Sequence, residues 1–300
     1  LKLSRGLGDV YKRQALTIIV SSLGTQRAAA QLPQPTETFK LSELGSEFKQ
    51  IYRSLKNRNF AALFSYGLFM GSAAGLGAAL YLYNVTYFFE FTGYEIAITA
   101  YAVLFSPLAA GLLAPAIGVR FGKKAAAIVM QVARVVLYPI PYICVLTGVW
   151  PEFGSVASIA IYTAFIFTEV VFGIISAVML DSMMADVVED SETHTNRRSE
   201  GLFFATRNFA GKFVSASGII FAGVIVSAVG FDSITNVADF TDEHRFTQAV
   251  FFLPIYCTVC LSAVACILMY RIDRESHEAN LQIIKAVSYT HLTLPTTMLV

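Results

Sequence analysis

The sequence predicts an all-α protein that is embedded in a membrane and crosses it about six times. Three observations predict this fold class. Apolar stretches recur along the chain, and each exceeds the roughly 20 residues that cross about 30 Å of hydrocarbon. The composition is 55% hydrophobic and 14% charged, which would leave a soluble protein of this length with too little polar surface. Finally, the basic residues gather in alternate connections between the apolar stretches.

The predicted spans follow one another with short connections, at residues 60–89, 96–119, 125–149, 155–180, 202–229 and 247–270. Within the first span, Gly67, Gly71 and Gly75 recur every four residues on one helix face, which predicts close packing of a neighbouring helix. Prolines interrupt other spans, and such breaks are tolerated where helices bend around a cavity. They are Pro107, Pro115, Pro139, Pro141 and Pro254.

The segments that flank the spans divide the chain further. Residues 15–25 read as the end of a truncated transmembrane helix, residues 26–57 as a central cytoplasmic linker, residues 58–275 as a six-helix bundle and residues 276–286 as a cytoplasmic tail. The DNA that can encode residues 9–14 has a reverse complement that, read one base out of phase, encodes residues 287–291. We therefore expect residues 1–14 and 287–300 to be translated sequencing adapters and the native segment to be a fragment.

The basic residues predict the orientation in the membrane. They precede the first span and occupy the second, fourth and sixth connections, counted from the first span, at Arg120, Lys123, Lys124, Arg197, Arg198, Arg271 and Arg274. The alternate connections carry Arg245 alone among lysines and arginines. By the positive-inside rule, the basic connections and both ends of the native segment lie in the cytoplasm, and we expect a multi-pass protein of the cell (inner) membrane.

Three ionisable residues lie deep inside predicted spans. Arg134 lies about 14 Å and Lys212 about 15 Å from the cytoplasmic ends of their helices, and Glu169 lies near the centre of the fourth span. An ionised side chain facing lipid there is costly, so these groups should face the bundle interior and pair or meet water. A structural ion pair and a role in the cation or substrate pathway both remain open.

Four polar or aromatic residues of the first span, Tyr66, Tyr81, Tyr83 and Asn84, are predicted either to line a polar cavity or to form a belt at the membrane interface. The four cysteines all fall inside spans, where no histidine or acid lies nearby, so they indicate packing rather than metal binding. We expect no metal site and no cofactor other than a coupling ion.

The segment after the fourth span combines alternating acids, a basic pair and a following lysine at Lys212. These charges read either as a solvated turn or as ion pairs that lock a cytoplasmic gate in one state only. The candidate gate residues are Asp186, Glu189, Arg197, Arg198 and Glu200, with Arg120 and Lys123 of the turn between the second and third spans.

At these residues the chain resembles the glycoside-pentoside-hexuronide:cation symporter family, the relatives of melibiose permease within the major facilitator superfamily. The match covers the Ala-Asp-Val-Val-Glu run at residues 185–189, the acid Glu192, residues 198–200 and Lys212. The turn at residues 120–124 resembles the superfamily's turn between paired helices, although Val119 stands where an acid is common. The resemblance covers nearly all of residues 15–285.

The resemblance implies the six-helix C-terminal half of a twelve-helix major facilitator fold, with the substrate site between the halves. Its missing partner would be the N-terminal six-helix half, where family members hold the cation-binding acids and most sugar contacts. Lys212 would lie near that cation site, whereas Arg134 and Glu169 are proposed from depth alone.

We therefore expect a secondary active transporter that couples Na⁺ or H⁺ to the uptake of a sugar or glycoside by alternating access. The alternative within the family is a carrier of lysolipids or other amphiphiles, and a channel or receptor is the alternative from another class. An enzyme is not expected, because the histidines outside the adapter-like ends, His194, His244 and His277, lie in loops or tails. A net charge of +1 gives no indication of nucleic-acid binding.

Overall fold

The computed structural model describes residues 14–26, 30, 55–195 and 200–272, with single residues at 276, 278 and 282. The chain divides into two units, residues 1–49 and 50–300. In the first unit, residues 14–26 form an exposed helix. Most of the predicted linker and tail, the adapter-like ends apart from Gln14, and Arg197 and Arg198 lie outside the described residues.

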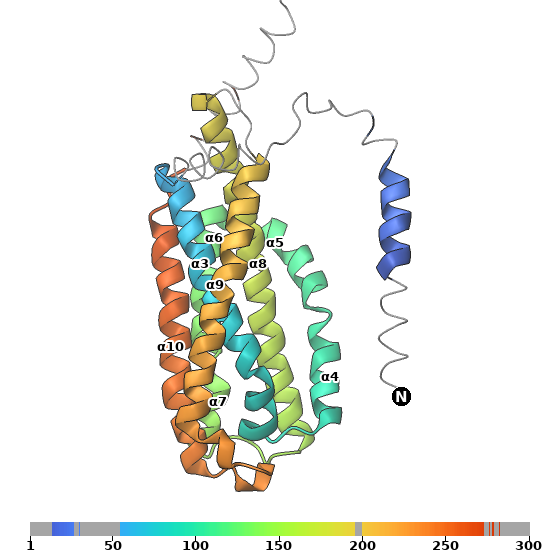
Figure 1. The fold of residues 1–300 in the computed structure, drawn as a ribbon, viewed down its shortest axis with the longest axis vertical. Helices are drawn as coiled ribbons and strands as arrows, with labels where there is room; N and C mark the ends of the chain where they lie inside the picture. The colour runs from blue at the N-terminus through green and yellow to red at the C-terminus, as the bar shows by residue number, and fades with distance from the viewer. Residues whose placement is uncertain are drawn as a thin grey trace, which may run out of the picture. The chain divides into compact units, whose positions relative to one another are not determined.

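The second unit is a bundle of helices that run roughly parallel and antiparallel to one another (Figure 1). Its elements are α3 (Arg58–Tyr83), η2 (Asn84–Phe88), α4 (Gly93–Val103), α5 (Ser106–Phe121), α6 (Lys123–Leu137), α7 (Ile140–Leu146), α8 (Val156–Thr195), α9 (Glu200–Val229), η3 (Phe231–Ser233), η4 (Val237–Asp239) and α10 (Asp242–Leu268). Six stretches of the described residues are long and apolar enough to cross a membrane, which confirms the predicted all-α membrane fold.

Prolines explain two of the breaks in these spans. The second span divides into α4 and α5 just before Pro107, which occupies the first turn of α5. The third divides into α6 and α7 at Tyr138–Pro139, and Pro141 lies in the first turn of α7. A proline has no N–H to donate to the preceding turn, so the helix ends there and a new one begins.

The fourth helix differs from the sequence prediction. The predicted span ends at residue 180, followed by a loop, whereas α8 continues to Thr195. The physical reason is packing: Met183, Met184, Val187 and Val188 lie at helical spacing and are all buried. The acids of this segment are therefore carried on the last turns of a helix rather than in a turn.

The glycine pattern of the first span is confirmed as a packing surface. A Cβ on Gly71 would lie 3.1 Å from the Gly211 Cα atom, and a Cβ on Gly75 would lie 3.1 Å from the Ser215 Cα atom. These positions hold α3 against α9, so the backbones approach where no side chain intervenes (Figure 1). On its other side α3 packs against α10, while α8 packs against α5 and α6.

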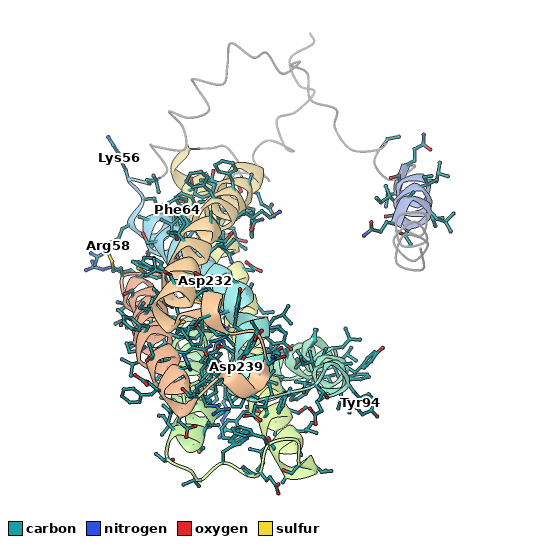
Figure 2. All side chains as sticks on the ribbon, turned by 60° about the horizontal axis from the view of Figure 1, so that its bottom comes forward. Lys56, Arg58, Phe64, Tyr94, Asp232 and Asp239 are labelled. Atoms are coloured by element: carbon teal, nitrogen blue, oxygen red, sulfur yellow. The ribbon has the colours of Figure 1, made fainter. Side chains whose placement is uncertain are left out.

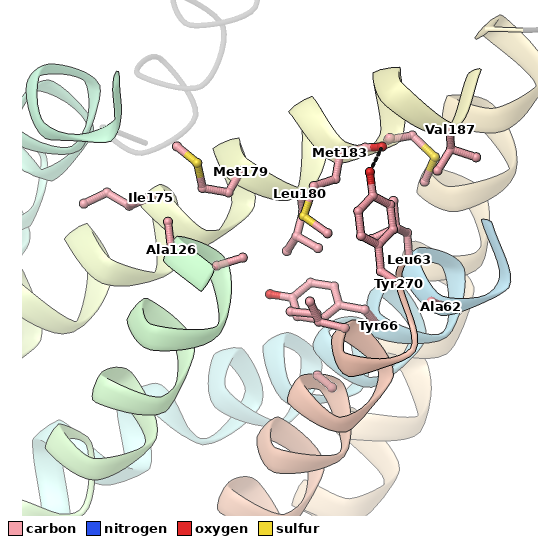
Figure 3. Packing of buried hydrophobic residues seen from close by; sticks show 14 of the residues in the cluster. Ala62, Leu63, Tyr66, Ala126, Ile175, Met179, Leu180, Met183, Val187 and Tyr270 are labelled. Atoms are coloured by element: carbon pink, nitrogen blue, oxygen red, sulfur yellow. Dashed lines mark hydrogen bonds between the residues drawn. The ribbon is translucent and has the colours of Figure 1, made fainter. Parts of the chain in front are cut away.

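Two apolar clusters form the core. One gathers around α8 and the first half of α3, where Leu63, Met183 and Tyr270 are almost fully buried (Figure 3). The other gathers around the second half of α3, with Phe88, Phe89 and Phe252 at its centre. Polar residues enter the bundle between these clusters and at its two ends.

We call one end of the bundle the basic end. It comprises the start of α3, the α5–α6 turn, the end of α8, the start of α9 and the end of α10. Lys56 and Arg58 lie there beside the first turn of α3, whereas Asp232 and Asp239 lie in the α9–α10 connection at the opposite end (Figure 2). Thr235 and Asn236 donate hydrogen bonds to the Asp239 carboxylate and hold its pKa below the ordinary value.

Candidate functional site

A buried ion pair lies in the interior of the bundle. The Arg134 guanidinium of α6 donates to the Glu169 carboxylate of α8, and its Nη2 also donates to the Tyr256 hydroxyl of α10 at 3.0 Å. Gly173, one turn after Glu169, leaves room for the arginine, because a Cβ there would lie 3.4 Å from the Arg134 Cζ atom. The Arg134 guanidinium thus connects α6, α8 and α10. This placement in the bundle interior keeps its charge away from lipid.

A small pocket borders the same carboxylate. Its volume is about 20 Å³, and its lining includes Tyr138, Tyr142, Tyr162 and Glu169. The pocket lies at the α6–α7 break, where Pro139 and Pro141 deprive the Val135 and Leu137 carbonyl oxygens of their usual helical donors. This space is large enough for about one water molecule among polar groups.

Lys212 does not join this pair. Its side chain is exposed on α9 and forms no hydrogen bond or ion pair with the residues that the structure describes. The expectation that all three deep charges face the bundle interior is therefore met by Arg134 and Glu169 and not by Lys212. The physical reason is rotation about the helix axis: the face of α9 that packs on α3 carries Gly211, Ser215 and Gly218, and Lys212 lies outside it.

At the basic end, the structure brings two of the candidate gate residues together. The Lys123 Nζ atom lies 2.7 Å from Asp186 Oδ1 and 2.9 Å from Asp186 Oδ2, and the aspartate side chain is only 7% exposed. The next lysine, Lys124, donates to the Leu268 and Tyr270 carbonyl oxygens at the end of α10. Two successive lysines therefore connect the α5–α6 turn to α8 and α10.

Tyr270 covers the Lys123–Asp186 pair from the α10 side. Its hydroxyl lies 3.5 Å from the Met183 carbonyl oxygen (Figure 3) and also 3.5 Å from Asp186 Oδ2, and it can donate to either. Burial, together with the nearby Asp186 carboxylate, raises the pKa of Tyr270 well above its ordinary value. The hydroxyl thus stays protonated and available as a donor.

The other candidate gate residues lie in different places at the basic end, and Glu189 is close enough to Tyr270 for its charge to act on that hydroxyl. Glu189 is half-buried two residues beyond Val187 on α8, and Glu200 is exposed at the first residue of α9. Arg120 is exposed, with its guanidinium carbon 5.6 Å from the centre of the Phe121 ring. Arg197 and Arg198 lie outside the described residues.

The four residues proposed as cavity lining lie in different environments. Tyr66 is buried, with its hydroxyl 3.5 Å from Ser176 Oγ. Asn84 is buried at the start of η2 and accepts a hydrogen bond of 2.6 Å from Gln248. Tyr83 is half-buried against the Phe231 ring, and Tyr81 is half-buried. None of them lines the small pocket at Glu169 or the groove between α4 and α8 described below.

Two ion-pair networks were not singled out in the sequence. On the exposed side of the bundle, Arg207 of α9 pairs with Asp181 of α8. At the opposite end, the buried Arg245 pairs with Glu90 and Asp242 and lies over the Phe153 ring. Arg245 is the lone basic residue of the opposite connections, which was the signal that could have identified it, and Arg207 could have been identified as an ionised residue inside the predicted span 202–229.

An apolar groove separates α4 from α8. Its volume is about 810 Å³, and Ile98, Phe105, Ala160 and Phe167 are among the lining residues. Tyr94 stands at the start of α4, projecting away from the rest of the bundle (Figure 2). Within the described part of the chain, no group of three or more His, Cys, Asp or Glu residues is placed to hold a metal ion.

Comparison with known proteins assigns the family. No curated protein and no solved structure matches the chain. The model of one family, described as MFS/sugar transport protein, matches residues 14–274, which include all six spans and the charged residues described above. The helical membrane bundle agrees with this match, and the chain belongs to the MFS/sugar transport protein family of the major facilitator superfamily.

Proposed function

We propose that the chain is the C-terminal, six-helix half of a twelve-helix transporter that moves a sugar or glycoside together with Na⁺ or H⁺ by alternating access. The observation that carries the coupling is the exposed Lys212 side chain, which lies inside a span and has no partner among the described residues. An ionised lysine facing lipid at this depth costs about 3 kcal/mol or more. The Lys212 face of α9 therefore borders water or another protein surface.

An acidic cation site in the N-terminal half would supply both the partner and the coupling. Lys212 would balance the carboxylates when the cation is absent, and an arriving cation would displace it by competing for the same charge. Arg134 and Glu169 would form a second, interior part of the pathway, supported by their pairing inside the bundle and by the pocket beside Glu169.

The Lys123–Asp186 pair supports a role for the basic end as the cytoplasmic gate. Breaking a pair between the α5–α6 turn and α8 would allow the ends of these helices to separate in one transport state. Asp186, Glu189, Glu200, Arg120, Lys123, Arg197 and Arg198 would be its charged residues. We place the basic end on the cytoplasmic side of a cell (inner) membrane, because connections rich in lysine and arginine face the cytoplasm by the positive-inside rule.

A second candidate is a carrier of lysolipids or other amphiphiles. The apolar groove between α4 and α8 favours it, because its volume of about 810 Å³ and its apolar lining suit an alkyl chain better than a sugar. The exposed charged side chains of α8 and α9 favour a polar ligand such as a sugar. We therefore prefer the sugar carrier to the amphiphile carrier.

The coupling is tested with Lys212→Ala in the full-length protein, with the chain joined to a matching N-terminal half and reconstituted in vesicles. We expect ion-driven accumulation of labelled substrate to be lost or strongly weakened, while counterflow of the same substrate and the amount of protein in the membrane stay near normal. Lys56→Ala is the matched control, because Lys56 is exposed before α3 and outside the proposed pathway. Normal coupled uptake by the Lys212 variant would refute the assignment.

The substrate class is read from the same vesicles. Counterflow of a labelled methyl glycoside without counterflow of a labelled lysophospholipid supports the sugar carrier, and the reverse supports the amphiphile carrier. Flux of either compound without counterflow would indicate a channel, because only a carrier exchanges its substrate across the membrane.

A further inference from the structure

The Arg207–Asp181 ion pair crosses the exposed side of α3. Arg207 belongs to α9 and Asp181 to α8. The helix that packs closely against α9 is α3, whereas α8 and α9 touch each other at few places. At the crossing, α3 has Gly67, where a Cβ would lie 3.4 Å from the Arg207 Cγ atom. The arginine stem therefore lies against the glycine, and its guanidinium reaches the aspartate. The Arg207 side chain is mostly buried, whereas the Asp181 side chain is 58% exposed.

Polar side chains lie near this pair although it is within membrane-spanning helices, and they alternate with the exposed Phe209 and Phe213 rings of α9. Asn208 and Lys212 are exposed on α9, and Lys212 lies only about 7.5 Å along the helix axis from Arg207. Exposed ionised groups are costly against hydrocarbon, and here two of them, Asp181 and Lys212, lie on adjoining helices. This side of the bundle thus borders water or polar protein, the setting in which a hydrophilic substrate travels.

The pair is also suited to exchanging partners. An ion pair whose carboxylate is exposed gains little over its hydrated ions, so it can open at small cost. A carboxylate accepts hydrogen bonds from two neighbouring hydroxyl groups, and a guanidinium has five N–H donors, of which the aspartate occupies only some. A ligand with adjacent hydroxyl groups can therefore bind to the pair without leaving either charge unpaired.

We propose that Asp181 and Arg207 form a hydroxyl-binding subsite for a sugar or other polyol. Asp181 accepts hydrogen bonds from two vicinal hydroxyls, while Arg207 positions the carboxylate and donates to a ligand oxygen. Gly67 is a positioning residue, because a Cβ there would already touch the Arg207 Cγ atom at 3.4 Å and a side chain larger than that of alanine would crowd the arginine. The inference rests on the proposed function in one respect, which is that the cargo carries hydroxyl groups.

The test measures ligand protection of a single reporter thiol in the full-length protein. Asn208→Cys provides an exposed thiol beside Arg207, after the native cysteines have been replaced by serine. The rate of alkylation by N-ethylmaleimide is measured with rising concentrations of methyl α-D-galactoside, methyl β-D-glucoside or, in a separate arm, lysophosphatidylcholine. We expect at least one glycoside to slow alkylation.

Asp181→Asn should raise the half-protecting glycoside concentration about tenfold, as expected from the loss of a charge-assisted hydrogen bond. Arg207→Gln should have a similar effect, with partial recovery in Arg207→Lys, and Gly67→Val should weaken protection. Asp232→Asn is the matched control, because this acid is exposed at the opposite end and should not change protection. Equal amounts of protein in the membrane confirm that each variant folds.

The outcomes separate the subsite from the proposed function. Unchanged glycoside protection in Asp181→Asn, with clear protection in the parent, overturns the subsite and leaves the sugar carrier standing. Absence of glycoside protection in the parent overturns both. Protection by lysophosphatidylcholine alone, insensitive to Asp181→Asn, overturns the subsite in favour of the amphiphile carrier.

Discussion

The interior of the bundle and the exposed side of α8 and α9 both carry ionised residues within membrane-spanning helices, but they hold them differently. Inside, Arg134 and Glu169 pair with each other among tyrosines, and the glutamate side chain is 5% exposed. Outside, the Asp181 side chain is 58% exposed beside a mostly buried Arg207, and Lys212 has no partner among the described residues. Both places pair an arginine with a carboxylate, and their surroundings set what each charge can do.

This difference separates stability from function. A buried charge that loses its partner cannot recover the interaction from water, so removing one member of the interior pair should destabilise the bundle. A charge on a polar surface can exchange its partner for water or a ligand, so it contributes little to stability and remains available for binding. Lys123 and Asp186 stand between these cases, since the lysine side chain is 36% exposed and the aspartate 7%.

The largest expected effect is at the interior pair. Glu169→Gln or Arg134→Gln should lower the free energy of unfolding by about 3–5 kcal/mol, because each leaves an uncompensated charge or an unsatisfied polar group in the bundle. The measurement is thermal unfolding of the purified protein in detergent, together with its amount in the membrane.

The matched control for the interior pair is the double variant Arg134→Met with Glu169→Leu, which removes both charges and should recover most of the loss. Stable single variants would show that water reaches this pair, and the contrast with the α8–α9 side would disappear.

An intermediate effect is expected at the basic end. Asp186→Asn should cost about 1–3 kcal/mol, because Lys123 loses its ionic partner but can turn its ammonium group toward water. The change is measured by the same thermal unfolding, with Arg120→Gln as the control, since Arg120 is exposed and has no ion pair within the described residues. If Asp186→Asn lowered the free energy of unfolding as much as Glu169→Gln does, the Lys123–Asp186 pair would be as inaccessible to water as the interior pair.

The smallest effect on stability is expected on the α8–α9 side. Asp181→Asn should change the free energy of unfolding by less than about 1 kcal/mol, because the Asp181 side chain is 58% exposed, so water can reach the contact and hydrate the Arg207 guanidinium in place of the carboxylate. Thermal unfolding in detergent is measured for the variants of Glu169, Asp186 and Asp181, and it ranks the three substitutions by the stability that each one costs. If this variant unfolded as readily as Glu169→Gln, the Asp181 carboxylate would belong to a buried structural network and could not exchange its partner for a ligand.

Sequence reasoning predicted the spans well and the partners of their charges poorly. The breaks at Pro107 and Pro139 follow from the missing N–H of proline, and the α3–α9 contact follows from glycines that lie on one helix face. These are local or periodic properties, so they can be recognised within one helix. The end of α8 was missed because the acids after residue 180 obscured the buried methionines and valines between them.

By itself, the sequence determined that residues 58–270 form a helical membrane bundle of six spans with deep charges and with basic residues at one end, because hydropathy, helix length and the order of charges are properties of the linear chain. Only the tertiary structure decided which charges meet. Arg134 pairs with Glu169, 35 residues away, and Lys212 remains on an exposed side, because helix rotation and packing set the contact. The position of a charged residue within a span gives its depth in the membrane. Its partner on another helix depends on how the helices are rotated and packed against one another.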